Sequence, residues 1–217
     1  MIKKISLPRD PVRLKEDLDR YVKLALELGA SASAIVSTNQ IVVDERVRMK
    51  CRFPLCAHYG ACMNCPPYTG SIEEMQKRLK LYQFAIVCKL DTPSDHLVSQ
   101  GAHCKGAESL KGLQDLQLLY KIVSTIESTA FYDGYYLATG FTAASCKLIW
   151  CKDLPCQALQ EGQGCRFQAR SYASLEAVGI DVYRLATSLG WDIYPIGSST
   201  TAEMIPFGSR YGLILID

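Results

Sequence analysis

Eight of the ten cysteines in this chain fall into two short segments, and cysteine thiolates are the usual ligands of zinc sites and iron–sulfur clusters. The first segment, box one, contains Cys51, Cys56, Cys62 and Cys65 with the spacing C-x4-C-x5-C-x2-C. The second, box two, contains Cys146, Cys151, Cys156 and Cys165 with the spacing C-x4-C-x4-C-x8-C. Scattered core cysteines would not form two groups of four, so the spacing predicts metal binding.

Three kinds of chemistry compete for the two boxes. Structural zinc usually takes its thiolates from two C-x2-C pairs, whereas box one has a single pair and box two has none. Disulfides need an oxidising compartment, and no apolar signal segment follows Met1. A [4Fe–4S] cluster needs four thiolates, and proline often follows its last cysteine, as in Cys65-Pro66. We therefore expect two [4Fe–4S] clusters, with zinc or thiol chemistry as the alternatives.

Basic residues flank both boxes, and a cluster held by four thiolates is an anion. Nearby cations and helix amino ends would stabilise its reduced state. His58 lies inside box one, where four cysteines make it a better hydrogen-bond donor to sulfur than a ligand. The residues expected beside the clusters are Lys50, Arg52, His58, Lys147, Lys152, Arg166 and Arg170. The alternative is that the charged ones are ordinary solvated loop residues.

The two remaining cysteines stand outside the boxes. Cys88 lies within the apolar run 84–90 and is expected to be a small core residue. Cys104 lies beside His103 and is an exposed thiol, an incidental residue or a substitute ligand. The sequence contains no G-x-G-x-x-G, P-loop, G-x-S-x-G or H-E-x-x-H motif, so it assigns no catalytic residue and leaves open whether the chain is an enzyme.

Composition narrows the classes of partner. The 217 residues include 24 Lys and Arg against 22 Asp and Glu, and a net charge of +2 is too small for the basic footprint of a nucleic-acid-binding protein. The longest apolar runs, 84–88 and 212–216, are far too short to span a bilayer. We expect a single domain over residues 1–217, located in the cytoplasm.

Apolar periodicity predicts the elements that must position the boxes. In the first half we expect a helix over 12–28, strands over 34–36 and 41–43, a helix from Ser71, and a strand over 84–90. In the second half we expect a helix over 110–126, a strand over 135–141, a helix over 175–189, and strands over 193–196 and 211–216.

The order helix, strand, cysteine loop, helix, strand occurs twice, which suggests pattern-repeated halves at 1–95 and 96–217. An alternation common to any α/β protein explains it equally well. Strand–helix–strand crossovers favour an α/β fold with an open, mostly parallel sheet covered by helices. Both cysteine-rich cluster loops would then follow the carboxyl ends of strands, where ligand sites of such sheets usually lie.

Two stretches resemble a family of predicted metal-binding proteins of anaerobic bacteria and archaea, the domain of unknown function 2284. They are Cys56-Ala-His-Tyr-Gly followed by Cys65-Pro-Pro-Tyr, and Cys165-Arg-Phe-Gln-Ala-Arg-Ser-Tyr-Ala-Ser-Leu-Glu-Ala-Val-Gly-Ile-Asp-Val. The family typically has Ala-Arg-Pro-Ser where this chain has Ala169-Arg170-Ser171-Tyr172, and the spacing among Cys146, Cys151 and Cys156 is wider than in many relatives. The resemblance spans nearly the whole chain and implies metal binding and an anaerobic setting, without a particular reaction.

Three functions fit these observations. If every iron has a cysteine ligand, the clusters are coordinatively closed and electron transfer to or from a partner redox enzyme is the natural chemistry. If Cys62 or Cys146 is not a ligand, one iron keeps an open position, as in an enzyme or a metal-delivery protein. The third possibility is an interaction module stabilised by zinc.

Overall fold

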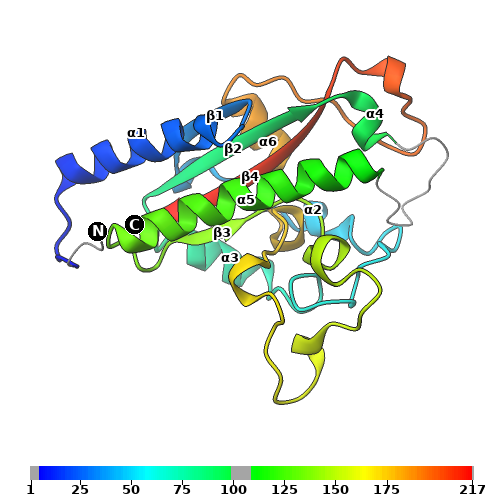
Figure 1. Ribbon diagram of the computed structural model, residues 1–217, viewed down its shortest axis with the longest axis horizontal. Coiled ribbons are helices and arrows are strands. Elements are labelled where there is room, and N and C mark those ends of the chain that lie inside the picture. The colour runs from blue at the N-terminus through cyan, green and yellow to red at the C-terminus, as the bar shows by residue number, and fades with distance from the viewer. Residues whose placement is uncertain (1–4, 99–108, 217) are drawn as a thin grey trace.

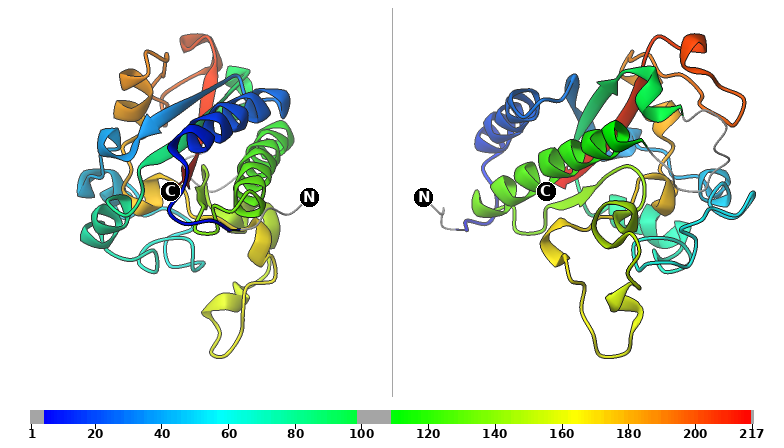
Figure 2. Two further views of the ribbon diagram at one scale, coloured as in Figure 1. Left: turned by 90° about the vertical axis from the view of Figure 1, so that its left-hand side faces the viewer. Right: turned by 45° about the vertical axis from the view of Figure 1, so that its right-hand side comes forward.

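A four-stranded sheet forms the centre of the molecule. The computed structural model describes residues 5–98 and 109–216. The strands are β1 (Ala32–Ser37), β2 (Phe84–Thr92), β3 (Thr139–Phe141) and β4 (Gly208–Ile216), in the spatial order β1-β2-β4-β3. Helices cover both faces of the sheet, so the molecule has three layers (Figure 1 and Figure 2).

Helices α1 (Pro11–Glu27) and α5 (Leu110–Tyr132) cover one face. Asp10 caps α1 by accepting a hydrogen bond from the Val12 amide at 2.9 Å, and proline stands in the first turn. The apolar residues of α1 recur every three or four positions and therefore share one side of the helix. Those of α1 and α5 pack against strand residues Ile86, Cys88, Ile214 and Ile216.

Helices α3 (Ile72–Leu79) and α6 (Val182–Ser188) cover the opposite face. Ser71 and Glu74 form the capping box at the start of α3, each accepting the other's backbone N–H at 3.2 Å. Side chains of a strand alternate between faces, so Ala85, Val87, Leu213 and Leu215 point toward α3 and α6. The strands are therefore buried on both sides, which explains their near-continuous apolar sequences.

The remaining elements are short. Two small helices are α2 (Glu45–Met49) and α4 (Ser94–Leu97). Single turns are η1 (Thr38–Gln40), η2 (Lys147–Cys151, a π turn), η3 (Gln157–Leu159), η4 (Gln168–Arg170), η5 (Glu176–Val178) and η6 (Ala202–Met204). Four of these six turns lie between residues 147 and 178, so regular structure is interrupted around box two.

The mixed α/β class is confirmed, but the sheet is not mostly parallel. All three strand pairings among the described residues are antiparallel, with Phe84 opposite Ile216 and Thr92 opposite Gly208 between β2 and β4. The prediction assumed that a helix crossover returns each strand in the same direction. The segment between β1 and β2 instead contains two short helices, η1 and box one, and so long a connection can return the chain in either direction.

Three predicted elements differ as well. The helix over 175–189 is divided into η5 and α6 because Gly179 takes a left-handed conformation with φ +84°. No strand forms over 193–196. The predicted strand over 41–43 is reduced to an isolated bridge between Val43 and Ile180.

Because the strands are antiparallel, β1 and β3 end at opposite ends of the sheet, and the chain takes a longer path from β1 to box one. Ser37, at the carboxyl end of β1, lies opposite Phe84, whereas β3 runs from Thr139 toward the other end of the sheet and leads into box two. Box one therefore does not follow β1 directly. Residues 38–50 carry the chain back, and this segment is fixed by a 2.9 Å hydrogen bond from the Asp44 amide to the Gly179 carbonyl.

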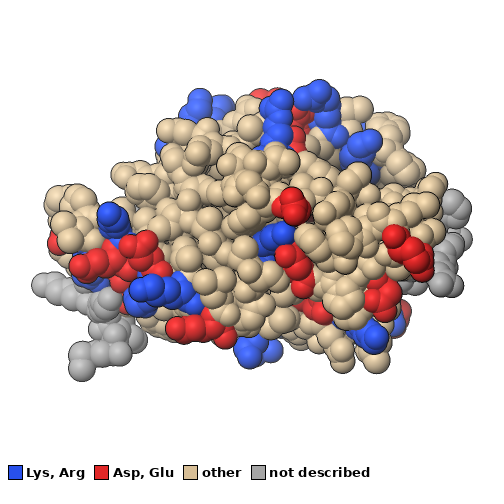
Figure 3. Space-filling view, turned by 90° about the horizontal axis from the view of Figure 1, so that it is seen from above, with Lys and Arg blue, Asp and Glu red and all other residues tan. Residues whose placement is uncertain are grey.

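Charged side chains do not gather on the face opposite the cysteine loops. In Figure 3 Lys and Arg are interspersed with Asp and Glu over a mostly uncharged surface. Within the residues that the structure describes, no helix combines the length and the apolar character needed to cross a membrane.

Of the two cysteines outside the boxes, the structure describes only Cys88. Cys88 lies on β2 and is 0% exposed, which confirms the prediction of a core residue. Burial raises the pKa of its thiol to about 12, so it remains protonated at neutral pH. Cys104 and His103 lie outside the described residues.

Candidate metal centre

Box one is built from tight turns. The Cys56 amide donates to the Cys51 carbonyl at 2.9 Å, and the Cys65 amide donates to the Cys62 carbonyl at 3.1 Å. Gly60, with φ +70°, donates from its amide to the Pro66 carbonyl at 2.7 Å and closes the loop. These turns place Cys62 and Cys65 inside the protein and leave Cys51 and Cys56 half-buried.

Box two follows β3 and projects from the body of the molecule, as the yellow-green loop in Figure 1 and Figure 2 shows. Cys146 is buried, whereas Cys151, Cys156 and Cys165 are half-buried. The Trp150 ring stacks on Phe167 with centroids 5.8 Å apart and brings the two ends of the loop together. The Trp150 indole also donates to the Arg170 carbonyl at 2.8 Å.

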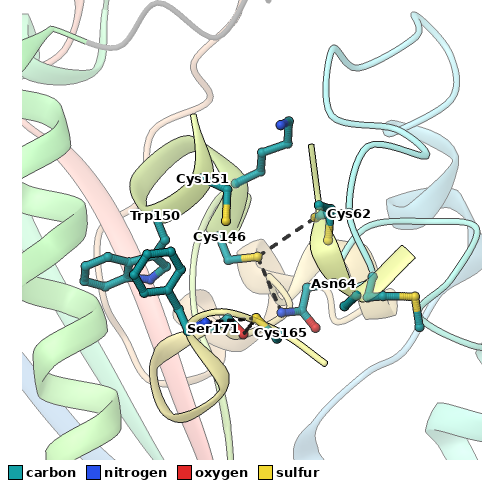
Figure 4. A pocket seen from close by; sticks show the side chains of 12 residues that line it. Cys62, Asn64, Cys146, Trp150, Cys151, Cys165 and Ser171 are labelled. Atoms are coloured by element: carbon teal, nitrogen blue, oxygen red, sulfur yellow. Dashed lines mark hydrogen bonds between the residues drawn. The ribbon is translucent and has the colours of Figure 1, made fainter. Parts of the chain in front are cut away.

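The two boxes meet at their most buried cysteines. The sulfur atoms of Cys62 in box one and Cys146 in box two lie 3.9 Å apart, and these residues are only 1% and 7% exposed. The Ser145 hydroxyl lies 3.5 Å from the Cys62 sulfur and 3.2 Å from the Cys65 sulfur. The Asn64 amide of box one donates to the Cys146 sulfur at 3.5 Å (Figure 4). Three thiols and one hydroxyl therefore form a compact polar group inside the core.

A cavity of about 70 Å³ opens beside this group. Its lining includes all four cysteines of box two together with Cys62. The volume is several times the roughly 10–15 Å³ that one water molecule needs. The cavity thus combines five sulfur donors with room for a group of several atoms.

The buried thiols differ in acidity because they bond to one another. Hydrogen bonds from Cys146 and Cys65 lower the pKa of Cys62. The same hydrogen bonds raise the pKa of Cys65 and of Cys146, and burial raises it further. Hydrogen bonds from the other two thiols thus stabilise one thiolate within this group, and a thiolate is the form that binds metal.

The outer cysteines also lie near one another. Burial raises the pKa of Cys51 to about 11, and the negative charge of Cys56 contributes to the same shift. Burial also raises the pKa of Cys151, and the negative charges of Cys165 and Cys156 raise it further. The His58 amide donates to the Cys56 sulfur at 3.5 Å, and the Phe167 amide and Ser171 hydroxyl contact the Cys165 sulfur at 3.4 and 3.3 Å.

Two buried polar atoms near these sulfurs have no hydrogen-bond partner within ordinary distance limits among the described residues: His58 Nε2 and the Tyr120 hydroxyl. Burial raises the pKa of Tyr120, and the sulfurs of Cys146, Cys65 and Cys62 raise it further, which places its hydroxyl near the three-thiol group. Burial lowers the pKa of His58, so the ring is neutral at pH 7. Buried polar groups rarely lack partners in native proteins. A sulfur-rich group bound here would supply acceptors for such donors.

The donor set therefore fits a metal group bound through thiolates. Among the residues that the structure describes, no set of three or more His, Cys, Asp or Glu side chains is arranged to hold a single metal ion. The fit rests instead on five cysteines around one cavity, on the chemistry of sulfur, and on the unpartnered donors beside it.

The predicted neighbours of the boxes have different surroundings. Lys147 lines the cavity and donates from its ammonium to the Leu154 carbonyl at 2.5 Å. Arg166 donates to the Pro155 carbonyl at 2.7 Å, and the Arg52 guanidinium lies over the Phe53 ring. Arg170 contributes its backbone carbonyl, and Lys50 and Lys152 are exposed. Lys147 is thus the predicted cation that the structure brings to the cavity, whereas the neutral His58 lies within box one.

Sequence reasoning missed several residues that contact the sulfurs. Ser145 and Asn64 stand directly beside box cysteines, so a search for hydroxyl and amide donors next to each ligand would have found them. Tyr120 is a different case. Tyr120 belongs to α5 and meets the Trp150 ring edge-on at 6.2 Å, and no spacing signal in the sequence connects it to the cysteines.

Comparison with known proteins places the chain in a family. A family model described as predicted metal-binding protein (DUF2284) matches residues 34–216, which include both boxes and all four strands except the first two residues of β1. The chain belongs to this family. No curated protein and no solved structure matches it.

Proposed function

We propose that this chain is a cytoplasmic iron–sulfur protein that binds two [4Fe–4S] clusters and passes electrons to or from a partner redox enzyme in anaerobic metabolism. One cluster would be held by Cys51, Cys56, Cys62 and Cys65, and the other by Cys146, Cys151, Cys156 and Cys165. The observation that carries the proposal is the cavity on which all four cysteines of box two converge. Four thiolates around a space larger than one ion are what a cubane cluster requires.

The two clusters would supply reversible one-electron chemistry. The chain's own residues would limit the access of water to the clusters and set their reduction potentials. The stacked rings of Trp150 and Phe167 exclude water from one side of the cavity. Donors from Asn64, Ser171 and the Phe167 amide reach ligand sulfurs and would withdraw charge from them. Hydrogen bonds and nearby cations stabilise the more negative oxidation state, so these donors and Lys147 would raise the reduction potential.

The first test is an iron and acid-labile sulfide count on protein purified without air. We expect about eight irons and eight sulfides per chain, which is four for each box. Cys156→Ala should lose about half of the iron, because box two then lacks one ligand. Cys88→Ala is the matched control, since it removes a thiol that lies in the core outside the boxes, and it should keep the full iron content. Zinc without iron would reject the proposal and favour a zinc-stabilised interaction module.

The contact between Cys62 and Cys146 favours a second candidate. If these two sulfurs, 3.9 Å apart, bind the same metal group, the other box keeps three thiolates and one iron has an open coordination position. Such an iron could bind a substrate or be transferred, as in an enzyme or a metal-delivery protein. Ready loss of one iron on mild oxidation, giving a three-iron cluster, would support this candidate. Two clusters that resist this loss would count against it.

A further inference from the structure

We propose that Cys62 of box one and Cys146 of box two form a disulfide when the metal-free chain meets a peroxide. The bond would join the two boxes covalently through their most buried cysteines. It would occupy two sulfurs that are proposed metal ligands, so the disulfide and the metal would exclude each other. The inference goes beyond the proposed function, because it rests on the contact between two thiols and holds for whichever metal the boxes bind.

The two thiols lie close enough to react with little movement of the chain. Their sulfur atoms are 3.9 Å apart, and a disulfide bond of about 2.05 Å requires them to approach by about 2 Å. Cys62 lies in a bend and Cys146 at the start of η2, so neither is fixed by a strand of the sheet. The Asn64 amide donates to the Cys146 sulfur at 3.5 Å, and the Ser145 hydroxyl lies 3.5 Å from the Cys62 sulfur. These contacts keep the two sulfurs facing each other.

The cavity supplies a route for the oxidant. Both Cys62 and Cys146 belong to its lining, and its volume of about 70 Å³ is large enough for hydrogen peroxide, which is one oxygen atom larger than water. Cys65 is absent from the described residues that line the cavity, and its thiol donates to the Ser145 hydroxyl at 3.2 Å. We therefore expect the oxidant to reach Cys62 and Cys146 before the C-x2-C pair of Cys62 and Cys65 can close.

Hydrogen peroxide is the only oxidant that the reaction needs. One sulfur, as the thiolate, attacks an oxygen atom of the peroxide, the O–O bond breaks, and the departing hydroxide takes up a proton to give water. The attacking sulfur becomes a sulfenic acid. The sulfur of the other cysteine then attacks the sulfenic sulfur, so that the S–S bond forms, the S–O bond breaks and the oxygen leaves as water. In total two thiols and one peroxide give one disulfide and two water molecules.

The contact between the thiols favours the disulfide over further oxidation. The sulfenic acid meets the second thiol within the same chain, which makes the second step fast. Cys62 and Cys146 are 1% and 7% exposed, so little peroxide competes with that thiol. A dithiol reduces a disulfide, whereas a sulfinic acid is irreversible in most proteins. The bond would therefore preserve both sulfurs for metal binding after exposure to an oxidant.

Peptide mapping of the full chain tests the inference. Protein purified without air is stripped of metal with a chelator, treated with one equivalent of hydrogen peroxide, alkylated to block free thiols and cut with trypsin. Fragment 122–147 contains Cys146 and no other cysteine, and fragment 53–77 contains Cys56, Cys62 and Cys65. We expect these two fragments to be joined in most chains, with the bond assigned to Cys62 by mass-spectrometric fragmentation. A dithiol should release them.

Two alanine variants of box one form a matched pair, because both cysteines lie in fragment 53–77. Cys62→Ala should abolish the joined fragments, whereas Cys56→Ala, which removes a half-buried thiol, should retain them. Joined fragments that persist in Cys62→Ala, a bond between Cys62 and Cys65, or sulfinic acid in place of the disulfide would overturn the inference. The assignment in the native sequence does not depend on the folding of either variant.

The same treatment of iron-loaded protein separates the inference from the proposed function. If Cys62 and Cys146 hold metal, the joined fragments should form at least about tenfold more slowly than in the metal-free chain, and only with loss of iron. Joined fragments formed at an equal rate with all iron retained would support the disulfide and reject these cysteines as ligands. Absence of the joined fragments from the metal-free chain would overturn the inference and leave the iron count to decide the proposed function.

Discussion

The sheet body and the two boxes are held together in different ways. The sheet body, meaning the four strands with α1, α3, α5 and α6, has fully buried apolar residues on both faces of β2 and β4. The boxes consist of turns, and they expose large apolar side chains such as Phe53, Leu55 and Leu154. Apolar burial stabilises the body, whereas the boxes depend on turns and on contacts between sulfurs. We infer that the body is stable by itself and that metal orders the boxes.

The largest expected effect comes from a substitution in the sheet body. Leu213→Ala on β4 should lower the free energy of unfolding by about 2–5 kcal/mol, because it leaves a cavity between the sheet and the α3 and α6 layer. The loss should be the same with and without metal. Urea unfolding followed by circular dichroism measures it.

Leu154→Ala in box two is the matched control, since Leu154 is 51% exposed. It should change the free energy of unfolding by less than about 0.5 kcal/mol. If the two variants were equally destabilised, the division between a packed body and a loosely packed loop would be wrong.

Removal of the metal should affect the boxes and leave the body folded. With anaerobic chelation we expect the far-ultraviolet circular dichroism to change little and protease cleavage within 52–63 and 152–164 to become on the order of tenfold faster. Limited proteolysis with mass spectrometry locates the cuts. Cleavage within β2 or β4 at the same rate would show that the body also depends on metal.

Replacement of Tyr120 should have opposite effects in the two metal states. In metal-free protein Tyr120→Phe removes a buried hydroxyl without a hydrogen-bond partner among the described residues, so stability should rise by about 1 kcal/mol. In metal-loaded protein the same change should lower iron retention, because a donor beside the sulfurs is lost.

Tyr211→Phe is the control for this experiment. The Tyr211 hydroxyl is also buried without a hydrogen-bond partner in the part of the chain that the structure describes, but it lies in the core beneath α3 and α6. Its replacement should leave iron retention unchanged. Identical results for the two tyrosines would remove the assigned role of Tyr120.

The smallest expected effect concerns Asp44, which caps α2 ahead of box one. Hydrogen bonds from Arg46 lower the pKa of Asp44 to about 2. A carboxyl whose folded pKa is depressed stabilises the fold above its unfolded pKa of about 4, and this contribution is lost as the pH falls toward 2. In metal-free protein Asp44→Asn should therefore weaken the dependence of stability on pH between about 4 and 2. Unfolding curves measured across this range provide the test, and superimposable pH profiles for the two proteins would refute it.

Local signals in the sequence predicted much of the sheet body. The Ser71 capping box and the periodicity over 12–28 identify α3 and α1, because both depend on neighbouring residues. The direction of the strands was not predictable from such signals, since it depends on the path of a long connection. The break comes from the left-handed conformation of Gly179, φ +84°, where a Cβ would also lie 2.3 Å from the Ile72 side chain.

The candidate site likewise combines features that neighbouring residues predict with features that depend on the path of the chain. The box cysteines were predicted as metal ligands from their spacing alone, and the fold brings all four cysteines of box two to the lining of one cavity. The junction between Cys62 and Cys146 was not predictable, because residues 38–50 return the chain along the sheet before box one begins. Spacing shows which thiols are close in sequence, whereas the fold decides which sulfurs face each other.

An anomalous-scattering map at the iron absorption edge, from crystals grown without air, tests the central claim most directly. We expect two compact iron peaks, one against the cysteines of box one and one in the cavity of box two, on either side of the Cys62–Cys146 contact. A map without iron at the boxes, or with one isolated ion at each, would contradict the account.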